Sequence, residues 1–455
     1  MKKIDKEALR MVLTAREENR ELRERRERYK RFTYGDQWCD QNPQTGKTEG
    51  ETAEETGYRP MTNNLIRQLV KSVIGLYRRE IAKKWSGTDR RTAEMNSIEE
   101  IDARTLEEFL ISGCAIQRVT TEKRIEGEGV WVDMVSPSRF FVNPFKDPRG
   151  RDIELTGMIH EMSPREIMIR FGEGRETKAK EIASELQCMS LGEYPVRLTS
   201  DRSHGKEEVI EMWVLEAREL LKVFDRENGT IFTTEPIEMP KIRRENRRRK
   251  KEGLATVGYK RFNTLRWHCK WLLPTGYVLR EYDSPWPHCR HPFAIKYFPL
   301  TDGEVHSFVE DVTEQQKCIN RMVTLIDKIL SVSAKGALLF PTDRRPEGFS
   351  WAEIGKIWSR PGSIIPYRNS EQSEVPRQIS GGGDQSGATS LLNIQMKMIE
   401  QVSGVTGALQ GRDVTSNTSA ALYDARTKNA ATSLIDLLES FVSFINYRNM
   451  LIAGS

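Results

Sequence analysis

Apolar residues recur at alternating steps of four and three in two stretches of the second half of the chain, and each stretch predicts a long helix. The first stretch begins near Glu310 and would span roughly 30 Å as a helix. Its heptad-like row comprises Val312, Gln316, Ile319, Val323, Ile326 and Leu330. The second stretch, 387–403, repeats the spacing less regularly with Leu391, Gln395, Met398 and Val402. The pattern therefore predicts two neighbouring rods.

The segment between these helices predicts a small strand–helix–strand insert. GALLFPTD at 336–343 has the apolar run of a strand, FSWAEIGKIW at 349–358 has helical spacing, and GSIIPYR at 362–368 again suggests a strand. After the second helix, a polar loop that contains glycine occupies 407–417. A last helix is predicted from about Thr418, with an apolar stripe of Leu422, Leu434, Leu437, Leu438, Phe441, Phe444 and Ile445.

The first 305 residues predict a body in which helices and strands are mixed. Helices are expected at 5–34, from Pro60 onward, at 93–112, at 164–171 and at 177–186. Thr62 or Asn63 would cap the helix after Pro60, and Ser163 would cap the helix at 164–171. Strands are expected at 130–135, 209–215, 260–273 and 293–298. The predicted fold class is α+β, mostly helical.

Composition narrows the function classes. The chain has 455 residues, enough for several domains, and 30% of them are charged. No apolar run approaches the roughly 20 residues that cross a bilayer, so we expect no membrane contact. The net charge of +5 permits contact with nucleic acid without demanding it. Six scattered cysteines without a CxxC pair favour free thiols in a reducing cytoplasm.

One group of residues has the composition of a metal site. It comprises His268, Cys269, His288, Cys289 and His291. Histidine and cysteine at this density can bind zinc. However, the two His-Cys pairs are adjacent in sequence, and neighbouring strand residues point to opposite faces. Structural roles explain these residues as well, so no metal ligand is predicted.

A basic run, KIRRENRRRKK at 241–251, has the charge to bind phosphates, because clustered cations displace counterions from a nucleic-acid backbone. Runs of this kind are more often solvated loops, and Glu245 and Glu252 dilute the charge. Both interpretations remain open at this point.

The sequence carries none of three common catalytic motifs. GxxxxGK[ST], GxSxG and HExxH are all missing, and GGGDQSG at 381–387 lacks the lysine of a phosphate-binding loop, which favours a hinge. No pair of carboxylates has a spacing that singles it out for acid–base work. We therefore expect no enzyme activity and no cofactor. Two rods that carry a small insert suggest a ring-forming channel subunit instead.

Four short elements together resemble the portal proteins of tailed bacteriophages. The first is Tyr34-Gly35-Asp36-Gln37-Trp38, and the second is Arg59-Pro60 followed by Asn63-Asn64, Ile66, Val70 and Gly75. The third comprises Asp311, Gln315, Gln316 and Asn320, at the family's first stem helix. The fourth comprises Ser403-Gly404-Val405, Gly411 and Ser419-Ala420. Each element is weak alone, and their order over most of the chain carries the resemblance.

The resemblance implies a division into portal segments. Residues 1–305 would be the wing, 306–333 the first stem helix, 334–380 the clip, 381–406 the second stem helix, 407–417 the tunnel loop, and 418–455 a long helix that returns to the wing. Because the chain stops at Ser455, a crown would be minimal or missing, which departs from many portals.

The same resemblance implies a function. Portals form a ring, usually of twelve subunits, at one capsid vertex, and double-stranded DNA is packaged and ejected through it. The expected partners are further copies of the chain, the major capsid and scaffolding proteins, the terminase motor and head-completion or adaptor proteins. The expected location is the virion, with the host cytoplasm during assembly.

Candidate functional residues follow from these assignments. The residues expected to face DNA in the tunnel loop are Gln410, Arg412, Asp413, Thr415 and Asn417. Contacts with DNA or a partner at the clip would involve Lys335, Arg344 and Arg345. Packing in the stem would involve Ile319, Val323, Ile326 and Leu330. A sliding polyanion favours such sparse charge over a deep basic groove, because tight phosphate binding would stall movement.

Two other functions are alternatives. A metal-dependent nuclease would need carboxylates or histidines that converge in one pocket. Another virion connector or a zinc-stabilised adaptor would lose its fold when a chelator removes the metal.

Overall fold

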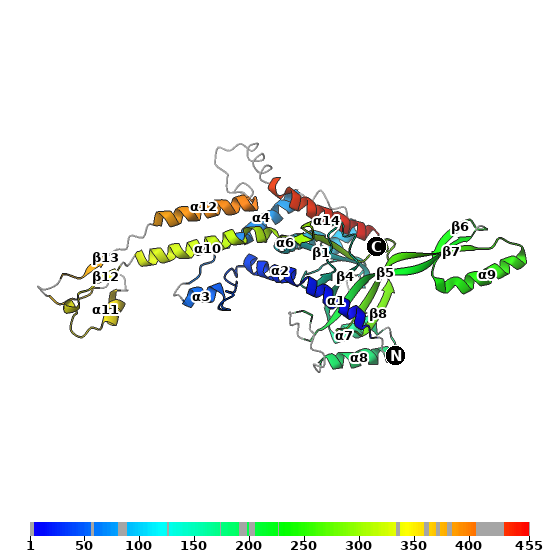
Figure 1. Ribbon diagram of the computed structural model, residues 1–455, viewed down its shortest axis with the longest axis horizontal. Helices are drawn as coiled ribbons and strands as arrows, with labels where there is room; N and C mark the ends of the chain where they lie inside the picture. Colours follow the sequence, from blue (N-terminus) through cyan, green and yellow to red (C-terminus); the bar gives the residue numbers. More distant parts are fainter. Residues whose placement is uncertain are drawn as a thin grey trace. The chain divides into compact units, whose positions relative to one another are not determined.

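The computed structural model describes most of the chain. The described residues are 4–55, 59–80, 89–124, 127–172, 174–190, 198–199, 205–225, 227–333, 337–358, 364–369, 374–379, 385–405 and 432–454. The chain divides into two compact units. The sheet unit comprises Met1–Glu27, Ile74–Ser307 and Leu434–Ser455, and the helical unit comprises Arg28–Val73 and Phe308–Ser433. Figure 1 labels the elements of both.

The sheet unit mixes helices with antiparallel strands. Its helices are α1 (Lys6–Glu18), α5 (Arg90–Asn96), α6 (Ile98–Ser112), α7 (Pro164–Phe171), α8 (Glu176–Ser190), α9 (Met239–Glu252) and α14 (Ile435–Ala453). Its longer strands are β1 (Cys114–Arg124), β2 (Gly127–Met134), β4 (Leu155–Met162), β5 (Glu207–Asp225), β7 (Gly258–Leu272), β8 (Val278–Asp283) and β9 (Phe293–Tyr297). Its shorter strands are β3 (Phe140–Val142), β6 (Thr230–Thr234), β10 (Pro299–Thr301) and β11 (Glu304–Val305). Helices α2 (Arg20–Thr33) and α4 (Leu65–Glu80) have residues in both units.

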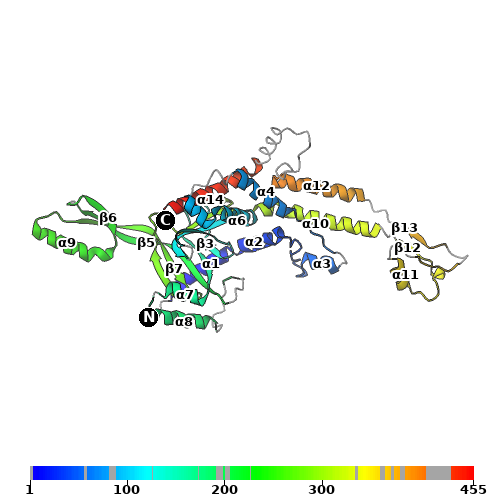
Figure 2. The same ribbon diagram turned by 180° about the vertical axis from the view of Figure 1, so that it is seen from behind.

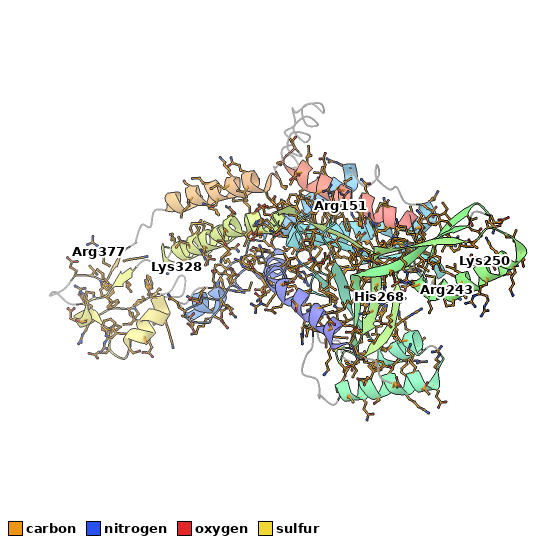
Figure 3. The ribbon with its side chains drawn as sticks, turned by 45° about the vertical axis from the view of Figure 1, so that its right-hand side comes forward. Arg151, Arg243, Lys250, His268, Lys328 and Arg377 are labelled. Atoms are coloured by element: carbon orange, nitrogen blue, oxygen red, sulfur yellow. The ribbon has the colours of Figure 1, made fainter. Side chains whose placement is uncertain are left out.

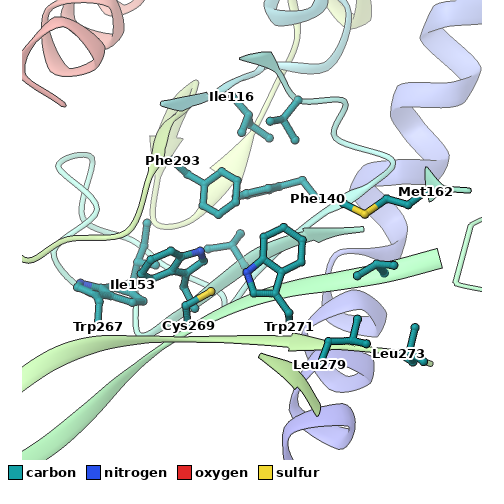
Figure 4. Close-up of a cluster of buried hydrophobic side chains, with 14 of the residues drawn as sticks. Ile116, Phe140, Ile153, Met162, Trp267, Cys269, Trp271, Leu273, Leu279 and Phe293 are labelled. Carbon is teal, nitrogen blue, oxygen red and sulfur yellow. The ribbon is translucent and has the colours of Figure 1, made fainter. Parts of the chain in front are cut away.

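The main sheet has the strand order β3-β4-β5-β7-β8, with β6 paired to β5. Successive strand residues face opposite sides, so each strand contributes to two cores. On β5, Val209 and Trp213 belong to one buried cluster, whereas Ile210 and Met212 belong to the other. Figure 4 shows the first cluster, in which Trp267, Cys269 and Trp271 project from one face of β7. The second cluster is closed by Ala8, Val12 and Ala15 of α1.

A smaller antiparallel sheet has the order β2-β1-β9, and α6 and α14 pack against it. Helix α14 buries the apolar stripe that its sequence predicted, including Leu437, Phe441, Phe444 and Ile445. The predicted start of this helix near Thr418 falls outside the described residues.

Strands β5 and β7 stay paired over a long register, from Ile210 opposite Leu272 to Phe224 opposite Gly258. Their distal parts, with β6 and α9, form an arm that has its own small core. That core comprises Leu221, Val223, Met239, Ile242 and Val257.

The helical unit is built around two long helices, α10 (Phe308–Ser333) and α12 (Gln385–Ser403), which occupy the two stretches where the sequence predicted rods. They pack against each other and lie side by side in both views (Figures 1 and 2). The remaining elements of the unit are α3 (Glu49–Glu55), β12 (Ala337–Leu339), η2 (Thr342–Arg344), α11 (Trp351–Trp358) and β13 (Arg377–Ile379).

Several element boundaries differ from the predictions. The helix expected over 5–34 is two helices that meet at Asn19. The Asn19 side chain donates there to the carbonyls of Ala15 and Val142, each at 2.7 Å. The helix at 93–112 is likewise interrupted at Ser97, which has φ of 49°. Ser163 caps α7 as predicted by accepting from Glu166 N–H.

The second strand of the insert was predicted in the wrong place. Residues 364–369 form no strand, and β13 at Arg377–Ile379 pairs with β12 instead. Pro366 lacks the N–H that a ladder requires, and Ile364 is 88% exposed. Arg368 N–H of this segment donates to the Arg344 carbonyl at 2.9 Å. The mixture of helices and antiparallel sheets agrees with the predicted α+β class.

Candidate functional site

The predicted packing row of α10 is buried at its start and opens toward its end. Ile319 is 0% exposed, Val323 and Ile326 are half-buried, and Leu330 is 49% exposed. Val312 and Gln316, which precede Ile319 in the row, are also fully buried. The later part of α10 therefore leaves apolar surface uncovered within a single chain.

Helix α12 has two different apolar faces. The buried or half-buried side chains recur at helical spacing and comprise Leu392, Gln395, Met396, Ile399 and Ser403. A second stripe is exposed and comprises Leu391, Ile394, Met398 and Val402. Three of the four residues in the predicted row, Leu391, Met398 and Val402, thus lie on the exposed stripe. A helix that exposes four large apolar side chains on one stripe has a surface suited to a partner.

A polar cluster joins α10 to the segment that precedes α4. Gln316 Oε1 accepts from the backbone N–H groups of Leu65 at 3.0 Å and Ile66 at 3.3 Å, and Gln316 Nε2 donates to the Asn63 carbonyl at 2.7 Å. Asn320 Oδ1 accepts from Gln316 Nε2 at 2.9 Å and from Asn63 N–H at 3.0 Å. Because the first N–H groups of a helix have no partner within it, Gln316 satisfies two donors of α4.

The cluster continues into the loop after α2. Asn320 Nδ2 donates to Gln37 Oε1 at 2.7 Å, and Gln37 Nε2 donates to Asn64 Oδ1 at 3.0 Å. Asn64 also accepts from Arg67 N–H at 3.1 Å, so it caps α4, one residue after the predicted caps Thr62 and Asn63. Residues singled out in three separate sequence elements therefore meet in one network, which sequence spacing alone did not indicate.

An ion network lies on the same part of α10. The Asp40 carboxylate accepts hydrogen bonds from Arg28 Nε at 2.8 Å, from Arg28 Nη2 at 2.7 Å and from the Lys317 ammonium at 2.7 Å. Lys317 also lies 2.9 Å from Glu49 of α3. Burial opposes ionisation of Asp40, but the hydrogen bonds from Arg28 and Lys317 outweigh it and lower the pKa of Asp40 to about 2.

This depressed pKa predicts a loss of stability in acid. The folded state favours the ionised carboxylate, so its contribution is complete above the unfolded pKa of 3.8 and disappears as the pH falls toward about 2. At 1.36 kcal/mol per pKa unit, the contribution is about 2 kcal/mol at neutral pH. In urea denaturation, the stability gap between the native chain and Asp40→Asn should shrink between pH 5 and pH 3. A gap that stays constant over this range would contradict the assignment.

The turn after α12 requires glycine. Gly404 has φ of +66°, and a Cβ atom there would overlap the Ser433 side chain, which itself donates to the Gly404 carbonyl at 3.2 Å. Ser403 Oγ accepts from Val405 N–H at 3.2 Å. These contacts explain the Ser-Gly-Val element: α12 ends at Ser403, and the glycine that follows takes the left-handed backbone conformation.

The basic residues predicted to act at the insert differ in exposure. Arg344 is 7% exposed and lies over the Tyr367 ring, whereas Arg345 is exposed and lies 5.6 Å from the centroid of the Trp351 ring. Lys335 lies outside the described residues, and so do Gln410, Arg412, Asp413, Thr415 and Asn417 of the predicted tunnel loop. Arg345 is therefore the one clip candidate whose exposed side chain the described structure shows.

The candidate zinc residues do not converge. His268 Nδ1 lies 2.6 Å from Asp283 Oδ1, and His291 packs against the Trp267 ring. Cys269 lies in the hydrophobic core, where burial raises the pKa of its thiol well above the ordinary value. Among the residues that the structure describes, no three His, Cys, Asp or Glu side chains are grouped for a metal ion.

The basic run at 241–251 is part of a helix, α9, and not a loop. Within the described ranges, no helix combines the length and the apolar content needed to cross a bilayer.

The sequence analysis did not identify Arg448 as part of a buried ion pair. Arg448 of α14 is 1% exposed, and its guanidinium contacts both oxygens of Asp102 on α6 at 3.0 and 3.1 Å. Gln117 of β1 also contacts both residues. An arginine within an otherwise apolar helix face was the available signal, because burial of such a charge requires a partner.

Comparison with known proteins gives one family. The model of the phage P22-like portal protein family matches residues 9–448, which is nearly the whole chain. A search of curated proteins finds no match.

Proposed function

The chain belongs to the phage P22-like portal protein family of structural head-to-tail connectors, and we propose that its copies form the DNA channel at a capsid vertex. In this proposal, α10 and α12 are the two stem helices and line the wall of a ring, in which twelve copies are expected. The ring conducts double-stranded DNA during packaging and ejection. It assembles in the host cytoplasm and remains in the virion.

The exposed stripe of α12 is the observation that carries the proposal. Leu391, Ile394, Met398 and Val402 would each be largely removed from water when a neighbouring copy packs beside the helix. The exposed end of the α10 row, at Leu330, would also be covered by a neighbouring copy. Repetition of one heterologous contact closes a ring when its rotation divides a full turn evenly.

Other parts of the chain have proposed partners. The insert, 334–380, acts as the clip that binds the terminase motor and later the adaptor proteins, with exposed Arg345 as a contact. The sheet unit contains most of the wing and faces the major capsid and scaffolding proteins. The tunnel loop, 407–417, provides sparse polar contacts to DNA through Gln410, Arg412, Asp413, Thr415 and Asn417. The family is structural, so it gives no support to the nuclease hypothesis.

Two substitutions on the exposed stripe should prevent ring formation. Ile394→Glu with Met398→Glu would place two carboxylates where a neighbour packs, and burial of an unpaired charge is costly. We expect electron micrographs to show rings for the native chain, and mass photometry to show mainly single chains for the double variant.

The matched control is Ser390→Glu with Asn393→Glu, which adds the same charge to exposed polar positions of α12. This control should still form rings. Rings in the double variant, or single chains for the native protein at all concentrations, would refute the proposed packing.

A further inference from the structure

The arm of the sheet unit holds α9 in one fixed orientation. Met239 and Ile242 lie in the small core, and Asn246 pairs with both backbone groups of Val257, at 2.9 and 2.7 Å. The buried Arg249 forms two bonds with Asp225, at 2.7 and 2.8 Å. These four positions recur at helical spacing, so they define the inner face of α9.

The outer face is strongly basic. Lys241 is paired with Glu238, and Arg248 is paired with Glu245. Five further cations are exposed and have no carboxylate partner among the described residues. They are Arg243, Arg244, Arg247, Lys250 and Lys251, of which Figure 3 labels Arg243 and Lys250 on α9.

The five cations form a regular array. Arg243, Arg247 and Lys250 follow one row, and Arg244, Arg247 and Lys251 follow the neighbouring row. Each row extends roughly 10 Å along the helix. Each strand of duplex DNA carries one phosphate charge per ~3.4 Å of the helix axis, so about three charges of one strand lie within this length. The array is thus long enough to contact several phosphates at once.

We propose that the outer face of α9 binds the phosphate backbone of duplex DNA without sequence preference. This surface goes beyond the channel, since α9 contributes nothing to the α10–α12 pair. Arginine, which supplies three of the five cations, matches phosphate geometry particularly well. A nucleic-acid backbone therefore fits the face better than an acidic protein.

The test uses the preassembled full-length protein and a covalently closed circular duplex. A closed circle cannot thread through a closed ring, so its binding reports a surface that DNA reaches without threading. The variant Arg243→Gln, Arg247→Gln, Lys250→Gln should bind the circle at least tenfold more weakly at about 0.1 M salt. The slope of log K against log salt should become shallower by up to about 2.7, at about 0.9 for each phosphate that the variant no longer neutralises.

The matched control is Lys241→Gln, Arg248→Gln, Arg261→Gln, which removes three exposed cations of the same arm that already have carboxylate partners. We expect less than a threefold change in affinity for the circle. Equal weakening in the two variants, or none in the first, would overturn the proposal. Polyglutamate that binds the native protein as tightly as the circle would also overturn it, in favour of an acidic protein partner.

Electron micrographs separate this result from the proposed function. The first variant should form the same rings as the native protein, because its substitutions lie on exposed positions of α9. Normal rings with unchanged DNA binding would refute only the role of α9. Failure of the native chain to form rings would refute the channel and leave the α9 measurement valid for the single chain.

Discussion

Replacing Arg448 with methionine should destabilise the sheet unit by about 3–5 kcal/mol, the range for removing one partner from a buried ion pair. Methionine fills most of the volume but leaves the Asp102 carboxylate buried with Gln117 and without its cation. The pair links α14 to α6 across 346 positions of sequence, so its removal would loosen the attachment of the last helix. Denaturant unfolding followed by tryptophan fluorescence would measure the effect, since Trp213 and Trp271 are buried in this unit.

Arg90→Met is the matched control. Arg90 lies on α5 of the same unit, where it is largely exposed and pairs at 2.8 Å with Glu94, an exposed carboxylate of the same helix. Exposed pairs of this kind contribute less than about 1 kcal/mol. Addition of Asp102→Leu to Arg448→Met should recover part of the stability, because it removes the orphaned carboxylate. Equal effects of Arg448→Met and Arg90→Met would contradict this account.

The sequence was sufficient for elements whose signal is local. Helical periodicity located α10, α12 and α14, and Ser163 was identified as the cap of α7 because a cap acts on a residue three positions away. Alternation located β7 nearly to its ends. In the insert, apolar character favoured a strand at 362–368, although Pro366 was the stronger signal against one.

Contacts between segments that are far apart in the sequence could not be predicted from local patterns. Arg448 belongs to a helix whose other marked positions are apolar, and nothing near it in sequence names Asp102 as its partner. For the basic run, the sequence left two interpretations open, a solvated loop and a phosphate-binding site. The helix is anchored by Met239 and Ile242, which contact Leu221 and Val223 only after β5 and β7 pair.

The polar residues of the family elements illustrate the same limit. Gln37, Asn63, Asn64, Gln316 and Asn320 were noted for their order along the chain, whereas the structure shows that they bond to one another. Three of the four elements that carry the resemblance therefore meet in one physical unit, a largely buried amide network. Such a network is costly to disturb, because each unpaired buried group loses its hydrogen bonds to water without a replacement.

Gln316→Leu should accordingly destabilise the helical unit by about 2–4 kcal/mol, because the change leaves the N–H groups of Leu65 and Ile66 without their side-chain acceptor. Hydrogen exchange at these two amides should accelerate at least tenfold, since the first turn of α4 loses its tie to α10. Gln315→Leu is the control one residue earlier, where Oε1 is buried without a hydrogen-bond partner in the described part of the chain, and it should cost little. Unchanged exchange at Leu65 and Ile66 in Gln316→Leu would show that the network does not hold α4 in place.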